Sequence, residues 1–357
     1  FVLITGFMII NVIKPDLKFS YSERRKLKAV PEYSFEKLME GKLFEEFEKY
    51  TLDQFILRDA FRSLKAYFVY YALFQKDNNK IYIVNNNINK MDYPLDVNSV
   101  INAATKFNEI YEKYLDGKNV YYSIIPDKNY FVAADNGYLS IDYEKMEELL
   151  TQNIKNMSYI NIFDTLTMDD YYLTDVHWRQ EKILKVADRI LSGMGNEKKA
   201  SDYLYTTKEL YPFYGSYYGQ AALEINPDIM VYLTNGIINN SRVYDYYHNL
   251  WTKVYSEEKF SGMDPYDVFL KGAMPLLTIT NSSITSSANQ KRELLLFRDS
   301  FGSSIAPLFL GAYSKITLID LRYISTDILE NYIDFSQEQD VLFLYNTQVL
   351  NNSYMLK

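Results

Sequence analysis

The chain has 357 residues, of which 48% are hydrophobic and 24% are charged, and its formal net charge is −8. This length can bury a substantial core in one large domain or two ordinary ones, and the composition excludes long disorder. An acidic chain with no concentrated Lys/Arg stretch is not expected to bind nucleic acid. The sequence contains no cysteine, which excludes disulfides, thiolate zinc sites and cysteine nucleophiles.

The first element is an uncharged stretch over residues 1–13, "FVLITGFMIINVI". It is shorter than the roughly 20 apolar residues that cross a bilayer. We expect it to be the end of a longer membrane anchor; a cleaved signal segment and a buried helix are the alternatives. Either of the first two places the protein outside the cytoplasm, anchored at the cell surface or secreted.

Residues 14–75 form a second segment. Residues 14–34 are polar and contain Pro15 and Pro31, which is typical of an extended lead. Apolar residues then recur at helical spacing up to residue 75, with Gly41 as a break, and this pattern predicts two amphipathic helices.

Residues 76–357 alternate between apolar strands and amphipathic helices. Strands are predicted over 80–84, 119–126, 159–164, 293–297, 315–321 and 341–345, and helices over 97–115, 143–156, 179–193, 305–313 and 326–335. Such alternation favours an α/β domain with a mostly parallel sheet covered on both faces. Residues 200–290 differ: tyrosine-rich short strands and a polar loop over 280–290 predict an insert or lid with β structure.

The segment "ELLLFRDSFGSS" places Ser300 between a predicted apolar strand and a helix. Ligands of open α/β sheets bind at the carboxyl ends of the strands, and helix-end amides there can stabilise an oxyanion. Ser300 is therefore a candidate nucleophile. The alternative is that it only caps the helix, a role that serine fills well.

Asp175 and His177, in "TDVHW", are the candidate acid and base. A serine nucleophile needs an imidazole to take its proton, and the imidazole needs a carboxylate to fix its tautomer. The Asp-x-His spacing allows this only in an irregular loop, so we expect a helix to begin near Trp178. Alternatively Asp175 caps that helix and His177 is a boundary residue. The other histidine, His248, is a second candidate base, near Asp245. Two distant histidines make a poor metal site, and we expect neither a metal nor a cofactor.

Taken together, these motifs resemble the DHHW family of exported bacterial proteins, which is similar to the SGNH-like domains of alginate O-acetyltransferases. The resemblance also covers "FSYSERRKLKAVPEYS", "LFEEFEKYTLDQFILRDAFRSLKAYF" and "YYSIIPDKNYF". It implies an SGNH-hydrolase-like, flavodoxin-like α/β/α fold, with Ser300 as nucleophile, His177 as base and Asp175 as orienting acid. Val176 replaces the first histidine of the family name, and Arg298 stands where SGNH enzymes carry glycine.

Three further residues are weaker candidates for the oxyanion hole or for substrate binding: Gly215, Arg298 and Lys128. The resemblance implies a serine esterase or O-acetyltransferase acting on a cell-surface polysaccharide or cell-wall glycan, with a membrane protein as a possible acetyl donor. The alternative is a non-catalytic, surface-anchored glycan-binding or assembly protein on the same fold, in which tyrosines of the insert serve as stacking platforms.

Overall fold

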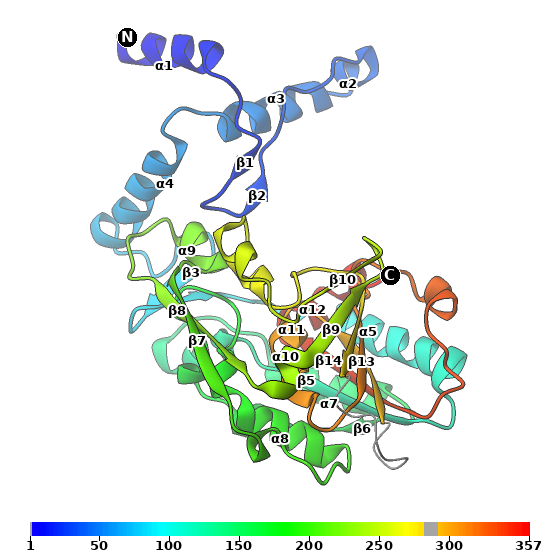
Figure 1. The fold of residues 1–357 in the computed structure, drawn as a ribbon. Helices are drawn as coiled ribbons and strands as arrows, with labels where there is room; N and C mark the ends of the chain where they lie inside the picture. Colours follow the sequence, from blue (N-terminus) through cyan, green and yellow to red (C-terminus); the bar gives the residue numbers. More distant parts are fainter. Residues whose placement is uncertain (1, 282–291) are drawn as a thin grey trace.

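The computed structural model describes residues 2–281 and 292–357 and is built around an eight-stranded sheet (Figure 1). The strand order is β10-β9-β11-β13-β12-β14-β5-β6. The block from β13 to β6 is parallel, and β11, β9 and β10 are added to it antiparallel. Their bounds are β5 Asn119–Ile125, β6 Ser158–Tyr159, β9 Ser241–Asp245, β10 Leu250–Thr252, β11 Leu276–Asn281, β12 Glu293–Arg298, β13 Lys315–Ile319 and β14 Gln339–Asn346.

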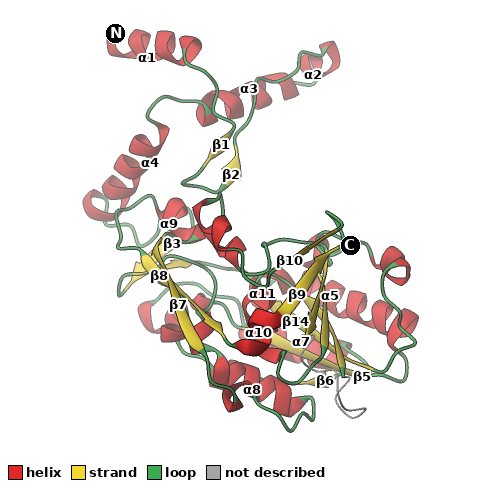
Figure 2. Cartoon of the chain, viewed as in Figure 1, coloured by secondary structure: helices red, strands yellow, loops and turns green. Residues whose placement is uncertain are grey.

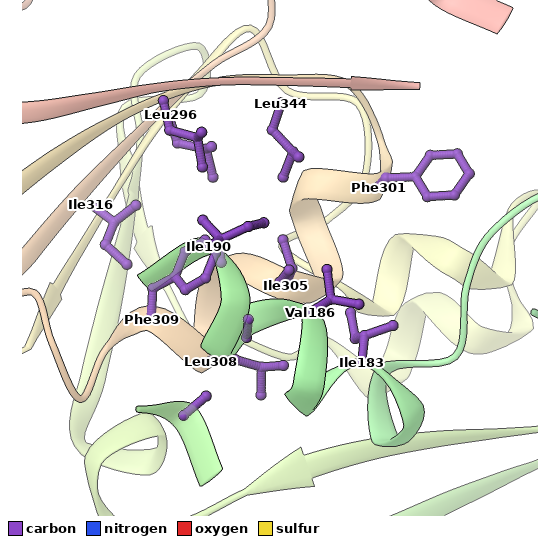
Figure 3. Close-up of a cluster of buried hydrophobic side chains, with 14 of the residues drawn as sticks. Ile183, Val186, Ile190, Leu296, Phe301, Ile305, Leu308, Phe309, Ile316 and Leu344 are labelled. Carbon is purple, nitrogen blue, oxygen red and sulfur yellow. The ribbon is translucent and has the colours of Figure 1, made fainter. Parts of the chain in front are cut away.

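Helices cover both faces of this sheet, because the middle positions of its central strands carry apolar side chains on both faces. Leu294 and Leu296 face a core cluster shared with α8 and α11, whereas Leu295 and Phe297 face a second cluster shared with α5 and α7. Figure 3 shows part of the first cluster, in which Ile190 lies near Leu296. The three-layer α/β/α arrangement with a mostly parallel sheet is therefore confirmed. The helix bounds are α5 Val97–Ile110, α6 Lys128–Val132, α7 Tyr143–Asn153, α8 Leu184–Gly193, α10 Gly236–Asn240, α11 Phe301–Ile305 and α12 Thr347–Leu350.

The predicted insert over 200–290 has two structural parts. Its first part is an antiparallel ribbon of β7 Thr206–Phe213 and β8 Asp228–Thr234, with α9 Ser216–Ala221 between them. Its second part supplies β9, β10 and β11, which extend the main sheet rather than forming a lid. Most of the polar loop predicted over 280–290 lies outside the described residues.

Several predicted elements are shorter than expected or differ in kind. The helix predicted from 179 begins at Leu184, after a 3-10 turn over Gln180–Lys182. The strand predicted over 159–164 is only β6, because the chain leaves the sheet edge after pairing with Tyr121 and Tyr122. The segment predicted as a helix over 326–335 is a 3-10 turn, Thr326–Asn331. The strand at 80–84 pairs in a separate hairpin, β3 Ile81–Val84 with β4 Asn87–Lys90.

The N-terminal segment stands apart from the sheet (Figures 1 and 2). It contains α1 Val2–Ile13, a short hairpin of β1 Phe19–Ser20 and β2 Arg25–Lys26, α2 Phe35–Met39, α3 Lys42–Asp53 and α4 Arg58–Tyr67. The predicted break at Gly41 is confirmed, with a positive φ of 77° that glycine adopts readily, but three helices replace the expected two. In the described part of the chain, no helix has the length and apolar character needed to cross a bilayer.

Candidate active site

Ser300 lies in the turn between β12 and α11, and its side chain does not cap the helix. Asp299 holds this turn instead: its Oδ1 accepts the Phe301 amide at 2.9 Å and its Oδ2 accepts the Asn346 amide at 2.7 Å. The Ser300 hydroxyl is therefore free to point elsewhere. The expectation that Ser300 acts only as a cap is wrong.

The segment around His177 is a tight loop closed by a bridge between Tyr171 and Trp178. Within it the carboxylate of Asp175 turns back, so that its Oδ1 lies 2.5 Å from His177 Nδ1 and also accepts the His177 amide at 3.0 Å. On the other side of the ring, Nε2 lies 2.7 Å from Ser300 Oγ. The structure thus brings the three residues selected from sequence into one continuous chain of hydrogen bonds. It places them in an irregular loop, as the Asp-x-His spacing requires.

The Asp175 carboxylate is fully buried, and its surroundings favour the ionised form. Burial by itself raises its pKa, but the hydrogen-bonded His177, the Arg24 guanidinium and the Ser216 amide together hold that pKa well below the ordinary aspartate value. The Ser216 amide, in the first turn of α9, donates to Oδ2 at 2.5 Å. A buried anion beside the imidazole is the arrangement that favours a transient imidazolium.

Lys128 is buried and contacts the backbone of the loop rather than open space, which corrects the expectation that it binds substrate. Its Nζ donates to the carbonyl oxygens of Tyr172 at 2.7 Å and Leu173 at 3.0 Å, as well as to those of Ile88 at 2.7 Å and Asp175 at 3.3 Å. Burial lowers the Lys128 pKa to about 7, while the nearby carboxylates of Asp228 and Asp175 act in the opposite direction. Among the described residues, the carbonyl groups of Tyr172 and Asp175 have no donor other than Lys128, so its position satisfies backbone groups that would otherwise be buried unpaired.

Asp228 performs the complementary task on the amides of the same loop. Its carboxylate accepts the amides of Leu173 and Thr174 at 2.8 Å each, and the Thr174 hydroxyl at 2.6 Å. The sequence gives no sign of this role, because an aspartate at the start of a strand carries no pattern that points to a loop about 55 residues away. Lys128 and Asp228 together pair the backbone groups that position Asp175.

Gly215 does not present its amide to the site, which corrects its assignment as an oxyanion donor. That amide donates to the Thr174 hydroxyl at 2.9 Å. A Cβ built on Gly215 would lie 2.3 Å from the Cβ of Asp175, so no side chain fits there. Glycine is required here for close packing against the carboxylate-bearing loop.

Arg298 is fully buried, so it is not available to bind a substrate at the surface as expected. Its Nη1 donates to the Asp299 carbonyl at 3.2 Å and lies 3.6 Å from Asp320 Oδ2. Its aliphatic stem lies against Gly302, where an added Cβ would be 2.6 Å from the Arg298 Cβ. Gly302 therefore leaves room for the Arg298 side chain beneath the turn that carries Ser300.

Tyr266, which the sequence analysis did not select, covers one face of the His177 ring. The two rings are stacked at 3.7 Å with an interplanar angle of 6°. The Tyr266 hydroxyl and the Trp178 indole both donate to Ser304 Oγ, at 2.9 and 2.8 Å. The sequence contains 35 tyrosines, and nothing in it distinguishes Tyr266. Its role depends on the fold, which brings the insert over residues 200–290 against the loop that carries His177.

The other histidine belongs to a different pair. His248 Nδ1 lies 2.7 Å from Asp245 Oδ2, and its side chain is about half exposed.

A cavity of about 750 Å³ lies away from Ser300, at the amino ends of β5, β12 and β14, with Lys118 and Arg292 in its lining. The position of the chemistry is therefore defined by the hydrogen-bonded side chains and not by this cavity.

Solved structures with the same fold were found. A DHHW family protein from Eubacterium siraeum DSM 15702 matches with a TM-score of 0.59 and 20% identity, over 78% of this chain and 94% of that one. Bacillus cereus PatB1 matches with a TM-score of 0.58 and 17% identity, over 76% and 97%. The O-acetyltransferase domain of Pseudomonas putida AlgJ is also found, but its TM-score of 0.38 at 11% identity, over 71% of this chain and 82% of that one, is too low to show a shared fold. No family model and no curated protein matches the chain. The fold resemblance predicted from the motifs is confirmed.

Replacing Lys128 should loosen the loop that carries Asp175. Lys128→Met leaves buried carbonyl groups without donors, and we expect a loss of about 2–4 kcal/mol in the free energy of unfolding, measured by urea denaturation. Lys145→Met is the control: the Lys145 side chain is 44% exposed and forms a surface ion pair with Glu148, so a change within about 0.5 kcal/mol is expected. Equal stability of the two variants would contradict the role given to Lys128.

The contribution of Asp267 to the free energy of unfolding should fall as the pH rises. Burial and the neighbouring Asp264 raise its pKa to about 7, against the attraction of Lys259, Arg24 and His177. Between about pH 4 and 7 the folded protein keeps a proton that the unfolded chain has released, so ionisation costs stability as the pH rises. Asp267→Asn should therefore stabilise the protein progressively from pH 4 to pH 8, relative to the unsubstituted chain. A stability difference that is constant across this range, measured by thermal unfolding, would refute the raised pKa.

Proposed function

We propose that the protein is an extracytoplasmic serine esterase or O-acetyltransferase that acts on a cell-surface glycan. The observation that carries the proposal is the uninterrupted hydrogen-bonded series from Asp175 through His177 to Ser300. This series lies at the carboxyl edge of a parallel sheet, where open α/β folds place their ligands.

In the first half-reaction Ser300 Oγ attacks the carbonyl carbon of an acetyl ester. His177 Nε2 takes the hydroxyl proton as the new C–O bond forms, and Asp175 stabilises the resulting imidazolium. The tetrahedral intermediate collapses when His177 returns the proton to the departing alcohol oxygen. The products of this step are the free alcohol and an acetyl group esterified to Ser300.

In the second half-reaction an acceptor hydroxyl group attacks the acetyl-serine. His177 removes the acceptor's proton and afterwards returns it to Ser300 Oγ, which restores the starting state. Water as acceptor gives hydrolysis, and a sugar hydroxyl gives transfer. The two outcomes share the same residues, so water exclusion and acceptor binding decide between them.

The developing oxyanion needs backbone donors near Ser300. In the turn before α11, the Phe301 amide is not available for this role, because it already donates to the Asp299 carboxylate. Among the described residues the Ser300 amide donates to no acceptor, which leaves it for the oxyanion. Gly215 is not part of this proposal.

The choice of a glycan and of acetyl transfer rests on the resemblance of the sequence motifs to the DHHW family. The proposal includes a membrane protein as acetyl donor and anchoring through the apolar segment over residues 1–13. A neutral sugar hydroxyl also suits an acidic chain better than a polyanionic acceptor does.

Ser300→Ala should abolish hydrolysis of 4-nitrophenyl acetate, with kcat/KM reduced by at least about 10³-fold, because no other group replaces the nucleophile. Ser303→Ala is the matched control: Ser303 is buried in α11, three residues after Ser300, and its hydroxyl has no partner in the described structure. Hydrolysis that persists in Ser300→Ala would remove the basis of the proposal.

Acetyl transfer should be detectable with a purified cell-wall glycan as acceptor and 4-nitrophenyl acetate as donor. A transferase releases 4-nitrophenol faster when the glycan is present, and mass spectrometry of the digested glycan finds an added acetyl group that depends on Ser300. Hydrolysis that the glycan leaves unchanged, without acetylated product, identifies an esterase.

A further inference from the structure

The tip of the N-terminal hairpin reaches the candidate active site. Arg24 sits between β1 and β2 with a positive φ of 52°, a left-handed conformation that is unfavourable for a residue with a long side chain. Its side chain is only 9% exposed. The surroundings must therefore hold this residue in place, and such residues gather at functional sites.

The Arg24 guanidinium makes contacts on several sides within the site. Its Nη1 donates to Asp264 Oδ1 at 2.7 Å and lies 3.6 Å from Asp175 Oδ2. Its Nη2 donates to the carbonyl oxygen of Tyr214, and its centre lies 5.9 Å from the ring centroid of Phe213. The Arg24 guanidinium, from the N-terminal hairpin, thus lies beside the Asp175 carboxylate that is hydrogen-bonded to His177.

Ion pairs and close packing hold the hairpin tip in this position. Glu23 lies 2.5 Å from an Arg58 nitrogen and 3.4 Å from an Arg62 nitrogen, both on α4. On the other side, a Cβ at Gly219 of α9 would lie 1.4 Å from the carbonyl oxygen of Ser22, so the tip packs against bare backbone. Arg62 also donates to the Gly219 carbonyl at 2.6 Å. The hairpin is therefore fixed to the elements that surround the site.

We propose that Arg24 is a positioning residue for the proposed reaction, and that the N-terminal hairpin completes the active site by holding the second oxygen of Asp175. The inference rests on the proposed function and names a residue that the sequence motifs did not select. Asp175 Oδ1 is committed to His177, so the orientation of the carboxylate depends on what binds Oδ2. The Ser216 amide and the Arg24 guanidinium are the groups at that oxygen.

The charges around the site explain why a cation is needed there. Arg24 Nη1 lies 3.6 Å from the Asp175 carboxylate and 2.7 Å from that of Asp264, and Asp264 in turn raises the pKa of Asp267. Lys128 is directed at loop carbonyls instead. Without Arg24, the field at the imidazole becomes more negative, which favours its protonated, non-basic form. The groups that face Asp175 and His177 from the packed elements are Arg24, Lys128, Tyr172, Ser216, Tyr217, Asp264, Tyr266, Asp267 and Ser300.

The test measures the titration of the two histidines by NMR, a readout that does not depend on activity. In Arg24→Met, the titration midpoint of His177 should rise by at least about 0.5 pH unit, because a nearby positive charge is lost. His248 should titrate unchanged and serves as an internal standard, since its partner is Asp245. Arg24→Lys keeps the charge and should recover most of the original midpoint, and it remains informative if the methionine variant does not fold.

Kinetics provide the second readout. The acidic limb of the kcat/KM profile for 4-nitrophenyl acetate should move to higher pH in Arg24→Met by the same amount as the His177 midpoint. Lys26→Met removes an exposed charge two residues away and should leave both measurements unchanged. A His177 midpoint that is the same in Arg24→Met and the unsubstituted chain would overturn the inference. If Ser300→Ala leaves hydrolysis intact but the midpoint still shifts, the proposed function fails while the electrostatic coupling stands.

Discussion

A buried carboxylate is the constraint on which the rest of the site depends. An ion in the protein interior loses its hydration, and it stays charged only when donors and cations replace that water. At Asp175, the lost water is replaced by His177, the Ser216 amide and Arg24. These groups come from the loop itself, from the start of α9 and from the N-terminal hairpin. The need to solvate one anion therefore links segments that are far apart in the chain.

The backbone of the loop imposes a second demand of the same kind. Residues 172–175 leave the regular pattern of strand and helix, so their amide and carbonyl groups must find other partners. Lys128 supplies donors to the carbonyls, and Asp228 supplies acceptors to the amides. Both side chains are buried, and both bind backbone groups of the loop. Their hydrogen bonds take the place of those that a strand or a helix would supply.

The nucleophile side of the site is simpler, because the sheet builds most of it. β12 is central and apolar, so its end fixes where the following turn emerges. Asp299 then ties that turn to its neighbour β14 through the Asn346 amide. Arg298 fills the space below and uses the room that Gly302 leaves. Arg298 is thus accommodated beneath the turn that carries Ser300.

The sequence by itself predicted the layered architecture, because hydrophobic periodicity reflects burial. Its local motifs made Ser300, His177 and Asp175 candidates and left helix capping as the alternative, and the resemblance of the combined motifs to the DHHW family favoured these three residues. Only the tertiary structure decided the roles of Lys128, Gly215 and Arg298, and brought Arg24 to the site. The physical reason is that a buried charge or a bare glycine is defined by its partners in space. Those partners are separated in sequence by distances that no periodicity encodes.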